Sequence, residues 1–313
     1  MMIDSSFHLR RPTLNDAPAV CKLVAICDTE DLGAPDIVIE DVLNMWSGFD
    51  LNENVWVVED EDAALIGYAF LEEDSEEKLF SYGCVRPFSR GRGVGTALVA
   101  ALETRALALR DESGQPKRLQ AMIPSSCSDA AALFEGFGFA PVRYFKRMNL
   151  HLDAEPAPAV LPEGFTIESF VKGRDEQAVY EAYTDAFADH WDFAAPTLEK
   201  FTERTQQLAF DEQWWRIARD AEGSVAGFAL CRMSEDQLYI EQLGVCRLHR
   251  GQGLALALLQ NVFASSYRTG QSHVSLGVDA ANPSGAYRLY EKAGMTPGYE
   301  VSIYEKILPN PVS

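Results

Sequence analysis

A strand, a loop rich in arginine and glycine, and a helix occur twice in this chain at a fixed spacing. In the second copy, the mainly apolar residues 239–245 lead to Arg250-Gly251-Gln252-Gly253 and then to a run without proline or glycine at 254–263. In the first copy, residues 79–85 lead to Arg90-Gly91-Arg92-Gly93-Val94-Gly95 and another helix-like run. The two arginines are 250 − 90 = 160 positions apart. Two copies in register predict two copies of one structural unit.

A strand that passes into a helix through such a loop forms an anion-binding site. Glycine lets the backbone turn with its N–H groups pointing inward, and the helix N-terminus adds a partial positive charge. A concave array of backbone N–H groups of this kind suits a pyrophosphate. The loops also hold basic side chains in a chain whose net charge is −20, namely Arg86, Arg90, Arg92, Arg247, His249 and Arg250. We therefore expect both loops to bind a phosphorylated ligand.

These residues resemble the signature of the GNAT superfamily of acyl-CoA-dependent N-acetyltransferases, Val-x-Pro-x-x-Arg/Gln-x-x-Gly-x-Gly/Ala. The first copy matches it at Val85, Pro87, Arg90, Gly93 and Gly95. The second copy matches it at Val245, Arg250, Gly253 and Ala255, but Arg247 stands where proline is usual. Two such domains in one chain are similar to the two-domain GNAT proteins that include mycothiol synthase. The resemblance covers nearly the whole chain and implies that acetyl-CoA is the cofactor.

The order of expected strands and helices predicts a mixed α/β fold of the α+β type, in two tandem domains. We expect the first domain over residues 1–152 and the second over 160–313, joined by an extended Pro/Ala segment at 153–159. A hairpin expected near 55–70 recurs near 214–230, and a short helix at 130–136 recurs at 282–292. The resemblance implies that each domain is a bent mixed sheet flanked by helices, with central strands that splay apart around the cofactor.

The resemblance also implies which residues contact acetyl-CoA. In the second domain these are Leu243, Gly244, Val245, Arg250, Gly251, Gln252, Gly253, Leu254, Ala255 and Asn282. In the first domain they are Gly83, Cys84, Val85, Arg90, Gly91, Arg92, Gly93, Val94 and Gly95. Pantetheine would lie along the motif strand like an added strand, and the N–H groups of residues 243–245 would donate to the thioester carbonyl.

A tyrosine in the second domain is the candidate general acid. The family motif Asn-x-x-x-Ala-x-x-Leu-Tyr-x-x-x-Gly-aromatic is matched at Asn282, Ala286, Leu289, Tyr290 and Gly294, but Met295 stands at the aromatic position. Tyr290 would protonate the departing thiolate, or would only pack its ring and bond its hydroxyl to the backbone. In the first domain, Gly138 matches Gly294 and so places Phe134 at the tyrosine position. Phenylalanine cannot donate a proton.

A glutamate on the second motif strand is the candidate general base. Strand alternation predicts that Glu241, Leu243 and Val245 share one face, and a carboxylate in an apolar strand is costly unless it is solvated or used. Glu241 would act as the base through a water, contact the acceptor, or lie at the rim. The 160-residue offset places Ser81 at its position. The first domain is therefore expected to be catalytically degenerate and the second to be catalytic.

The acceptor side is expected near His190, Trp191 and Asp192, between the first helix of the second domain and its next element. The alternative is that Trp191 packs in the core and the polar residues form a solvated turn. The net charge of −20 argues against nucleic acid, whose phosphates need a basic face. It favours a cationic amine acceptor, or it serves solubility alone.

Other classes of protein are disfavoured by the sequence. No apolar run approaches a membrane span, and the N-terminus has neither the basic nor the apolar region of a signal peptide. The six cysteines form no CxxC pair and are expected to be reduced thiols in the cytoplasm, and the five histidines show no metal-ligand spacing. A nicotinamide-binding fold is disfavoured because no acidic residue closes a following strand in a βαβ unit.

Two functions remain. The first is an acetyl-CoA-dependent N-acetyltransferase that moves an acetyl group to a primary amine of a small molecule, with its chemistry in the C-terminal domain. The second is a non-catalytic acyl-CoA-binding or sensing protein. Tyr290 and Glu241 discriminate between them, because a sensor needs neither.

Overall fold

The computed structural model describes residues 6–35, 37–109, 116–207, 210–234, 237–282 and 285–309, and the chain divides into two compact units. Unit 1 comprises Met1–Phe145 and Tyr299–Ser313, and unit 2 comprises Lys146–Gly298. The boundaries fall inside strands β6 (Ala140–His151) and β12 (Thr296–Ile307). This division differs from the linear one over 1–152 and 160–313, because most of the last strand belongs to the first unit.

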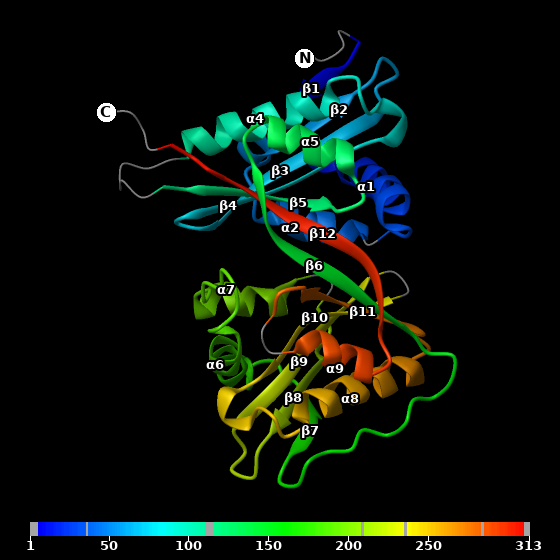
Figure 1. Ribbon diagram of the computed structural model, residues 1–313, viewed down its shortest axis with the longest axis vertical. Helices are drawn as coiled ribbons and strands as arrows, with labels where there is room; N and C mark the ends of the chain where they lie inside the picture. Colours follow the sequence, from blue (N-terminus) through cyan, green and yellow to red (C-terminus); the bar gives the residue numbers. More distant parts are fainter. Residues whose placement is uncertain are drawn as a thin grey trace. The chain divides into compact units, whose positions relative to one another are not determined.

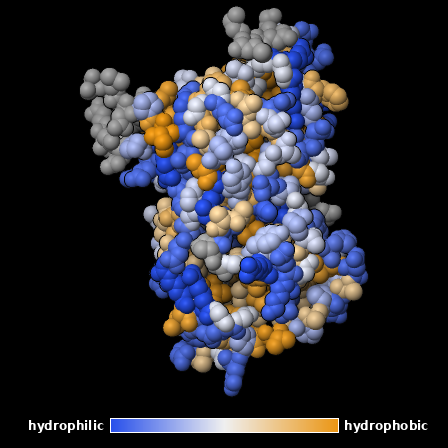
Figure 2. All heavy atoms as spheres, in the orientation of Figure 1, coloured by the Kyte–Doolittle hydropathy of each residue, from blue (hydrophilic) through white to orange (hydrophobic). Residues whose placement is uncertain are grey.

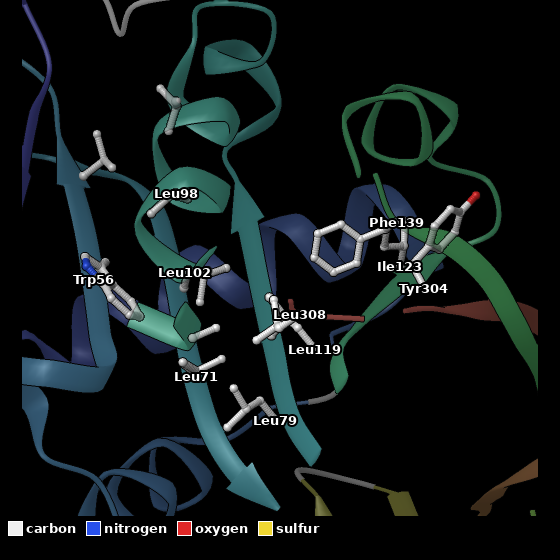
Figure 3. Packing of buried hydrophobic residues seen from close by; sticks show 14 of the residues in the cluster. Trp56, Leu71, Leu79, Leu98, Leu102, Leu119, Ile123, Phe139, Tyr304 and Leu308 are labelled. Atoms are coloured by element: carbon white, nitrogen blue, oxygen red, sulfur yellow. The ribbon is translucent and has the colours of Figure 1, made fainter. Parts of the chain in front are cut away.

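Strand β12 joins unit 1 through backbone pairing and through packing. It pairs antiparallel with β5 (Arg118–Pro124) over Val301 to Ile307. Tyr304 and the following Leu308 are buried in the same cluster as Leu119 of β5, as Figure 3 shows. Alternating apolar residues have the same pattern whichever sheet a strand joins, so the sequence does not reveal this arrangement.

The sheet of unit 1 has the strand order β1-β2-β3-β4-β5-β12, with β4 and β5 parallel and the other pairs antiparallel (Figure 1). Its remaining elements are β1 (His8–Arg10), η1 (Leu14–Asp16), α1 (Ala17–Leu32), α2 (Ile39–Ser47), α3 (Leu51–Asn54), β2 (Val55–Glu59), β3 (Leu65–Ser75), β4 (Lys78–Val85), η2 (Pro87–Ser89), α4 (Val94–Ala108) and α5 (Ser128–Gly136). One core lies between the sheet and α4, and a second lies between the sheet and helices α1 and α2.

The sheet of unit 2 repeats this plan in the order β6-β11-β10-β9-β8-β7. Its elements are β7 (Thr166–Ser169), α6 (Glu176–Phe187), α7 (Leu198–Glu203), η3 (Arg204–Gln206), η4 (Glu212–Trp214), β8 (Trp215–Arg219), β9 (Val225–Ser234), β10 (Gln237–Val245), η5 (Arg247–His249), α8 (Leu254–Arg268), β11 (His273–Asp279) and α9 (Ala286–Lys292). Helices α8 and α9 pack on one core, and α6 and α7 pack on another. The helix expected from residue 282 begins at Ala286, and residues 283–284 lie outside the described residues.

The two central parallel strands separate in each unit. In unit 1, β4 pairs with β5 only over Lys78 to Ser81. In unit 2, β10 pairs with β11 only over Gln237 to Ile240. The C-terminal halves of β4 and β10 therefore have a sheet edge that no described residue of β5 or β11 pairs with. This is the splay that the family resemblance implied, and it leaves backbone groups able to bond to an extended ligand.

A β-bulge lies in β10 at the point where the splay begins. Ile240 pairs with Cys231 and Gln242 pairs with Leu230, so Glu241 is an extra residue between two consecutive pairs. A bulge of this kind interrupts the alternation of side chains and re-aims the inserted residue. The prediction that Glu241 keeps a regular alternation with Leu243 is therefore wrong.

Unit 1 has no bulge at the corresponding place. Ser81 pairs with Leu71 and Tyr82 pairs with Phe70 without interruption. The offset between the repeats is 242 − 82 = 160 after the bulge and 240 − 81 = 159 before it. The structural equivalent of Ser81 is therefore Ile240, which corrects the expected match with Glu241, and Glu241 has no equivalent in unit 1.

The described part of the chain contains no helix long and apolar enough to cross a membrane. Figure 2 shows hydrophilic and hydrophobic side chains intermixed on the visible face, with hydrophilic ones abundant, as the acidic composition leads one to expect.

Candidate functional site

The two motif loops have the same backbone shape. Gly251 and Gly253 have φ values of 76° and 86°, and Gly91 and Gly93 have 74° and 86°. Glycine tolerates this left-handed region at little cost. A Cβ atom built on Gly251 or Gly253 meets nothing within 4 Å, so the space beside the loop is open. Helices α4 and α8 start directly after the second glycine without a side-chain cap. These features fit a pyrophosphate held by backbone N–H groups.

The side chain of the motif arginine in unit 2 is bound to the protein itself. Arg250 donates through Nε to the Val245 carbonyl at 3.4 Å and through Nη2 to the Ala186 carbonyl at 2.9 Å. It also pairs with Asp189 at 3.4 Å, and Asp189 pairs with Arg247 at 2.6 Å. The guanidinium thus ties the loop to the end of α6. The Arg250 guanidinium therefore already has partners within the protein.

Unit 1 uses its motif arginine in the same way. Arg90 donates through Nε to the Val85 carbonyl at 3.1 Å. Its Nη1 and Nη2 form a bidentate ion pair with the Asp31 carboxylate of α1, at 2.8 and 2.7 Å. Arg92 lies over the Phe7 ring, 4.3 Å from its centroid. The positive charge that the sequence shows in the loops therefore serves partly to fix their shape.

The strand segment expected to hold pantetheine lies at the splay in unit 2. Residues Leu243, Gly244 and Val245 pair with β9 on one side and face the splay on the other. A Cβ atom on Gly244 would lie 2.3 Å from the Phe228 ring, so only glycine fits there. The Phe228 ring thus packs directly on the backbone of Gly244, its partner in the β9–β10 ladder.

Tyr290 of α9 is a buried residue, with 8% of its surface exposed. Its carbonyl accepts from the Met295 N–H at 3.0 Å, and Phe134 accepts from the Phe139 N–H at 3.1 Å in the same way. Phe134 therefore occupies the Tyr290 position in unit 1. Burial, and then the nearby Tyr239, raise the pKa of Tyr290 from 10.0 to about 12. The hydroxyl keeps its proton at neutral pH, as a proton donor must.

This raised pKa gives a measurable expectation. Below about pH 11, the wild type and Tyr290→Phe should show the same increase in tyrosinate absorbance, because a pKa near 12 leaves Tyr290 protonated there. Ultraviolet titration of both proteins, with circular dichroism to verify the fold at each pH, checks this. A difference with a midpoint near 10 would contradict it.

The Glu241 carboxylate is held by two arginines. Its Oε2 accepts from Nη2 of Arg204 at 2.5 Å, and its Oε1 lies 3.1 Å from Nε of Arg232. The side chain of Glu241 is 28% exposed. A carboxylate offers about four acceptor positions, so both oxygens retain capacity for a further donor such as an amine or a water.

Sequence reasoning did not identify the residues around Glu241. Arg232 of β9 and Arg147 of β6 both stack on the ring of Tyr239, at 5.2 and 4.2 Å from its centroid. Nothing in the sequence marks Arg204 as a neighbour of Glu241, or Arg147 as a neighbour of Tyr239.

The expected acceptor residues lie in the loop between α6 and α7 of unit 2. His190 is an exposed residue whose ring stacks on Phe187, with ring centroids 4.4 Å apart. Partial burial of the ring and the Arg250 charge lower the pKa of His190, against the opposing effects of Asp279 and Asp189. The neutral imidazole is therefore favoured. Asp192 has a φ of 57°, which marks a tight turn beside Trp191. Asn282 follows β11 and donates its N–H to the Asp279 carbonyl at 3.1 Å.

The corresponding face of unit 1 is apolar. Phe80, Tyr82 and Cys84 of β4 pack against the cluster that contains α1 and α2. Phe70 of β3 stacks on Tyr82 with ring centroids 5.9 Å apart. Aromatic rings of β3 and β4 line this face, so unit 1 combines an intact motif loop with strand side chains that are mainly apolar.

Comparison with known proteins identifies the family. Residues 176–295 match a model described as the acetyltransferase (GNAT) family, and residues 51–141 match one described as an acetyltransferase (GNAT) domain. A protein named mycothiol acetyltransferase from Thermobispora bispora is 35% identical over 244 residues, which cover 74% of this chain and 77% of that protein. One of the same name from Acidothermus cellulolyticus is 33% identical over 304 residues, covering 89% and 88%.

Solved structures agree with this assignment. A GCN5-related N-acetyltransferase from Sphaerobacter thermophilus has a TM-score of 0.84 and 35% identity, and the match covers 99% of this chain and 98% of that one. A tandem GNAT protein from the clavulanic acid biosynthesis pathway has a TM-score of 0.76 at 17% identity, covering 97% and 100%. The second likeness shows the fold alone.

Proposed function

Because this chain belongs to the GNAT acetyltransferase family and uses acetyl-CoA, we propose that it acetylates a primary amine of a small molecule and that the chemistry takes place in unit 2. One observation carries the assignment to unit 2. That unit has both a carboxylate at the splay, Glu241, and a hydroxyl on the following helix, Tyr290. Unit 1 has Phe134 at the tyrosine position and no bulge residue.

In this proposal, the residues of unit 2 have separate roles in cofactor binding and in proton transfer. Bound acetyl-CoA supplies the acetyl group as a thioester. Backbone N–H groups of the Gly251–Gly253 loop and of the α8 N-terminus bind its phosphates, and those of residues 243–245 bind along the splayed edge. Glu241 accepts a proton from the acceptor amine, directly or through a water, and Tyr290 donates its hydroxyl proton to the sulfur that leaves.

The relatives suggest where to begin with acceptors. Two of them are named for mycothiol, so a mycothiol-type acceptor is the first to test against a panel of other small amines. The acidic net charge of −20 supports a cationic amine in general. The experiment is to measure thiol release from acetyl-CoA with each amine, and to identify the acetylated product by mass spectrometry.

A second function is supported for unit 1 by a specific observation. It keeps a complete motif loop, but the strand side chains on its corresponding face are mainly apolar. We propose that unit 1 is an acyl-CoA-binding module without chemistry of its own.

Matched valine substitutions test whether the chemistry takes place in unit 2 and not in unit 1. Gly253→Val and Gly93→Val place the same side chain at the same φ of 86°, so both introduce similar backbone strain. Gly253→Val should abolish most turnover because it obstructs the loop of unit 2, whereas Gly93→Val should leave turnover largely intact. Steady-state assays check turnover, and calorimetry with acetyl-CoA checks binding in each variant. Equal losses in two folded variants would contradict the assignment of chemistry to unit 2.

A further inference from the structure

We propose that Arg204 and Arg232 are positioning residues, which hold the Glu241 carboxylate in the orientation that the acceptor amine requires. This inference rests on the proposed function of unit 2 and adds two residues that its motifs do not include. Neither arginine belongs to the motif strand or to the motif loop.

Arg204 approaches Glu241 from the helical side of the unit. It begins η3, directly after α7, and Phe201 of α7 is buried with 1% exposure, which fixes this segment to the core. Its Nη2 donates to Glu241 at 2.5 Å while its Nη1 donates to the Gln242 side chain at 3.0 Å. One planar guanidinium thus binds two consecutive side chains of the bulge at once, a geometry that a lysine ammonium does not reproduce.

Arg232 approaches from the neighbouring strand. It pairs directly with Tyr239 in the β9–β10 ladder and stacks on that ring at 5.2 Å, while its Nε lies 3.1 Å from Glu241. Arg147, which is 8% exposed, stacks on the same ring at 4.2 Å. The Tyr239 ring therefore supports Arg232, and Arg232 supports the carboxylate.

The bulge explains why such support is needed. An inserted residue has no partner across the ladder, so sheet pairing does not fix the direction of the Glu241 side chain. A free glutamate side chain samples many rotamers, and ordering it costs conformational entropy. Two guanidinium groups that bind opposite oxygens restrict both its position and its rotation.

The same pair of ladder positions in unit 1 holds neither an arginine nor a tyrosine. Glu72 and Phe80 occupy the ladder positions of Arg232 and Tyr239. Arg232 therefore occurs in the unit that has the bulge carboxylate, whereas the corresponding described position of the other unit is a glutamate.

A double-mutant cycle tests the inference. Arg204→Gln and Arg232→Gln are made in the wild type and in Glu241→Gln, and kcat/KM for the amine is measured together with acetyl-CoA affinity and melting temperature. Arg219→Gln is the matched control, because Arg219 pairs with Glu168 at 2.6 Å and with Asp175 at 2.7 Å on a different part of unit 2.

Each arginine substitution alone should lower kcat/KM roughly 10- to 100-fold, as expected when a reacting group is misplaced. Acetyl-CoA affinity should not change. In the Glu241→Gln background, the same substitutions should have no further effect beyond about twofold, because positioning matters only while the carboxylate is present. Arg219→Gln should act equally in both backgrounds.

Arg204→Lys and Arg232→Lys keep the positive charge and serve as controls in case the glutamine variants fail to fold. Each lysine variant should be more active than the corresponding glutamine variant. Additive losses in the cycle, or single variants within about twofold of the wild type, would overturn the positioning role while leaving the acetyltransferase assignment intact. A wild type that acetylates no amine would instead overturn the proposed function, and the positioning role with it.

Discussion

Tyr290→Phe is expected to lower kcat by roughly 10²–10⁴-fold with little change in KM. The substitution removes one hydroxyl and retains the ring, which packs in the core beside Met295. Substrate binding should survive because the proton is needed only as the thioester bond breaks. The measurement is steady-state kinetics with the best amine of the panel, supported by a single-turnover experiment to establish that chemistry limits the rate.

Stability provides the control for this substitution. Phenylalanine already occupies the equivalent position in unit 1, as Phe134, so the fold accommodates it there. The melting temperature and the acetyl-CoA affinity of Tyr290→Phe should therefore match those of the wild type. A variant that keeps kcat within a few-fold of the wild type, with chemistry rate-limiting, would remove Tyr290 from the mechanism.

Glu241→Gln should lower kcat/KM for the amine by roughly 10²–10⁴-fold, because glutamine keeps the shape of the side chain but cannot accept the proton of the amine. Whether the loss of kcat/KM comes from a lower kcat or from a higher KM distinguishes two roles of Glu241. A general base loses kcat, whereas a residue that only binds the acceptor mainly raises KM. Kinetics over a range of amine concentrations at saturating acetyl-CoA provide both values.

Loss of the carboxylate also leaves Arg204 and Arg232 without their shared counter-ion. Glu241→Gln should therefore be somewhat less stable, and activity is to be compared well below its melting temperature. Unchanged acetyl-CoA affinity would show that the motif loop remains intact. Activity equal to that of the wild type would assign Glu241 to the rim of the site and leave the choice of base to another group, such as the neutral His190.

Gly253 is a better position than Arg250 for testing the loop of unit 2. The sequence suggests that Arg250 neutralises phosphate, but its side chain binds Asp189 and two backbone carbonyls. Reversing its charge would break that connection and deform the loop for a reason unrelated to the cofactor. At Gly253 the open space beside the backbone is itself the feature under test.

The sequence alone determined the features that depend on local chain geometry. The repeat places two strand–loop–helix segments in register, and the glycines at 91, 93, 251 and 253 all adopt the left-handed backbone that their residue type favours. The spacing from Gly294 back to Tyr290 also predicted the equivalence with Phe134, since a short helix closed by glycine has nearly fixed dimensions. Such features need only a few adjacent residues to specify them.

Tertiary structure alone decided the features that depend on distant partners. Strand β12 pairs with β5 of the first unit, and an alternating apolar pattern does not determine which sheet edge a strand pairs with. The bulge at Glu241 appears only in the register between β9 and β10, because one inserted residue leaves the local sequence looking like any other strand. Arg204 reaches Glu241 from 37 positions away, since the fold brings η3 beside β10. The arginines that contact Glu241 could therefore be identified only from the tertiary structure.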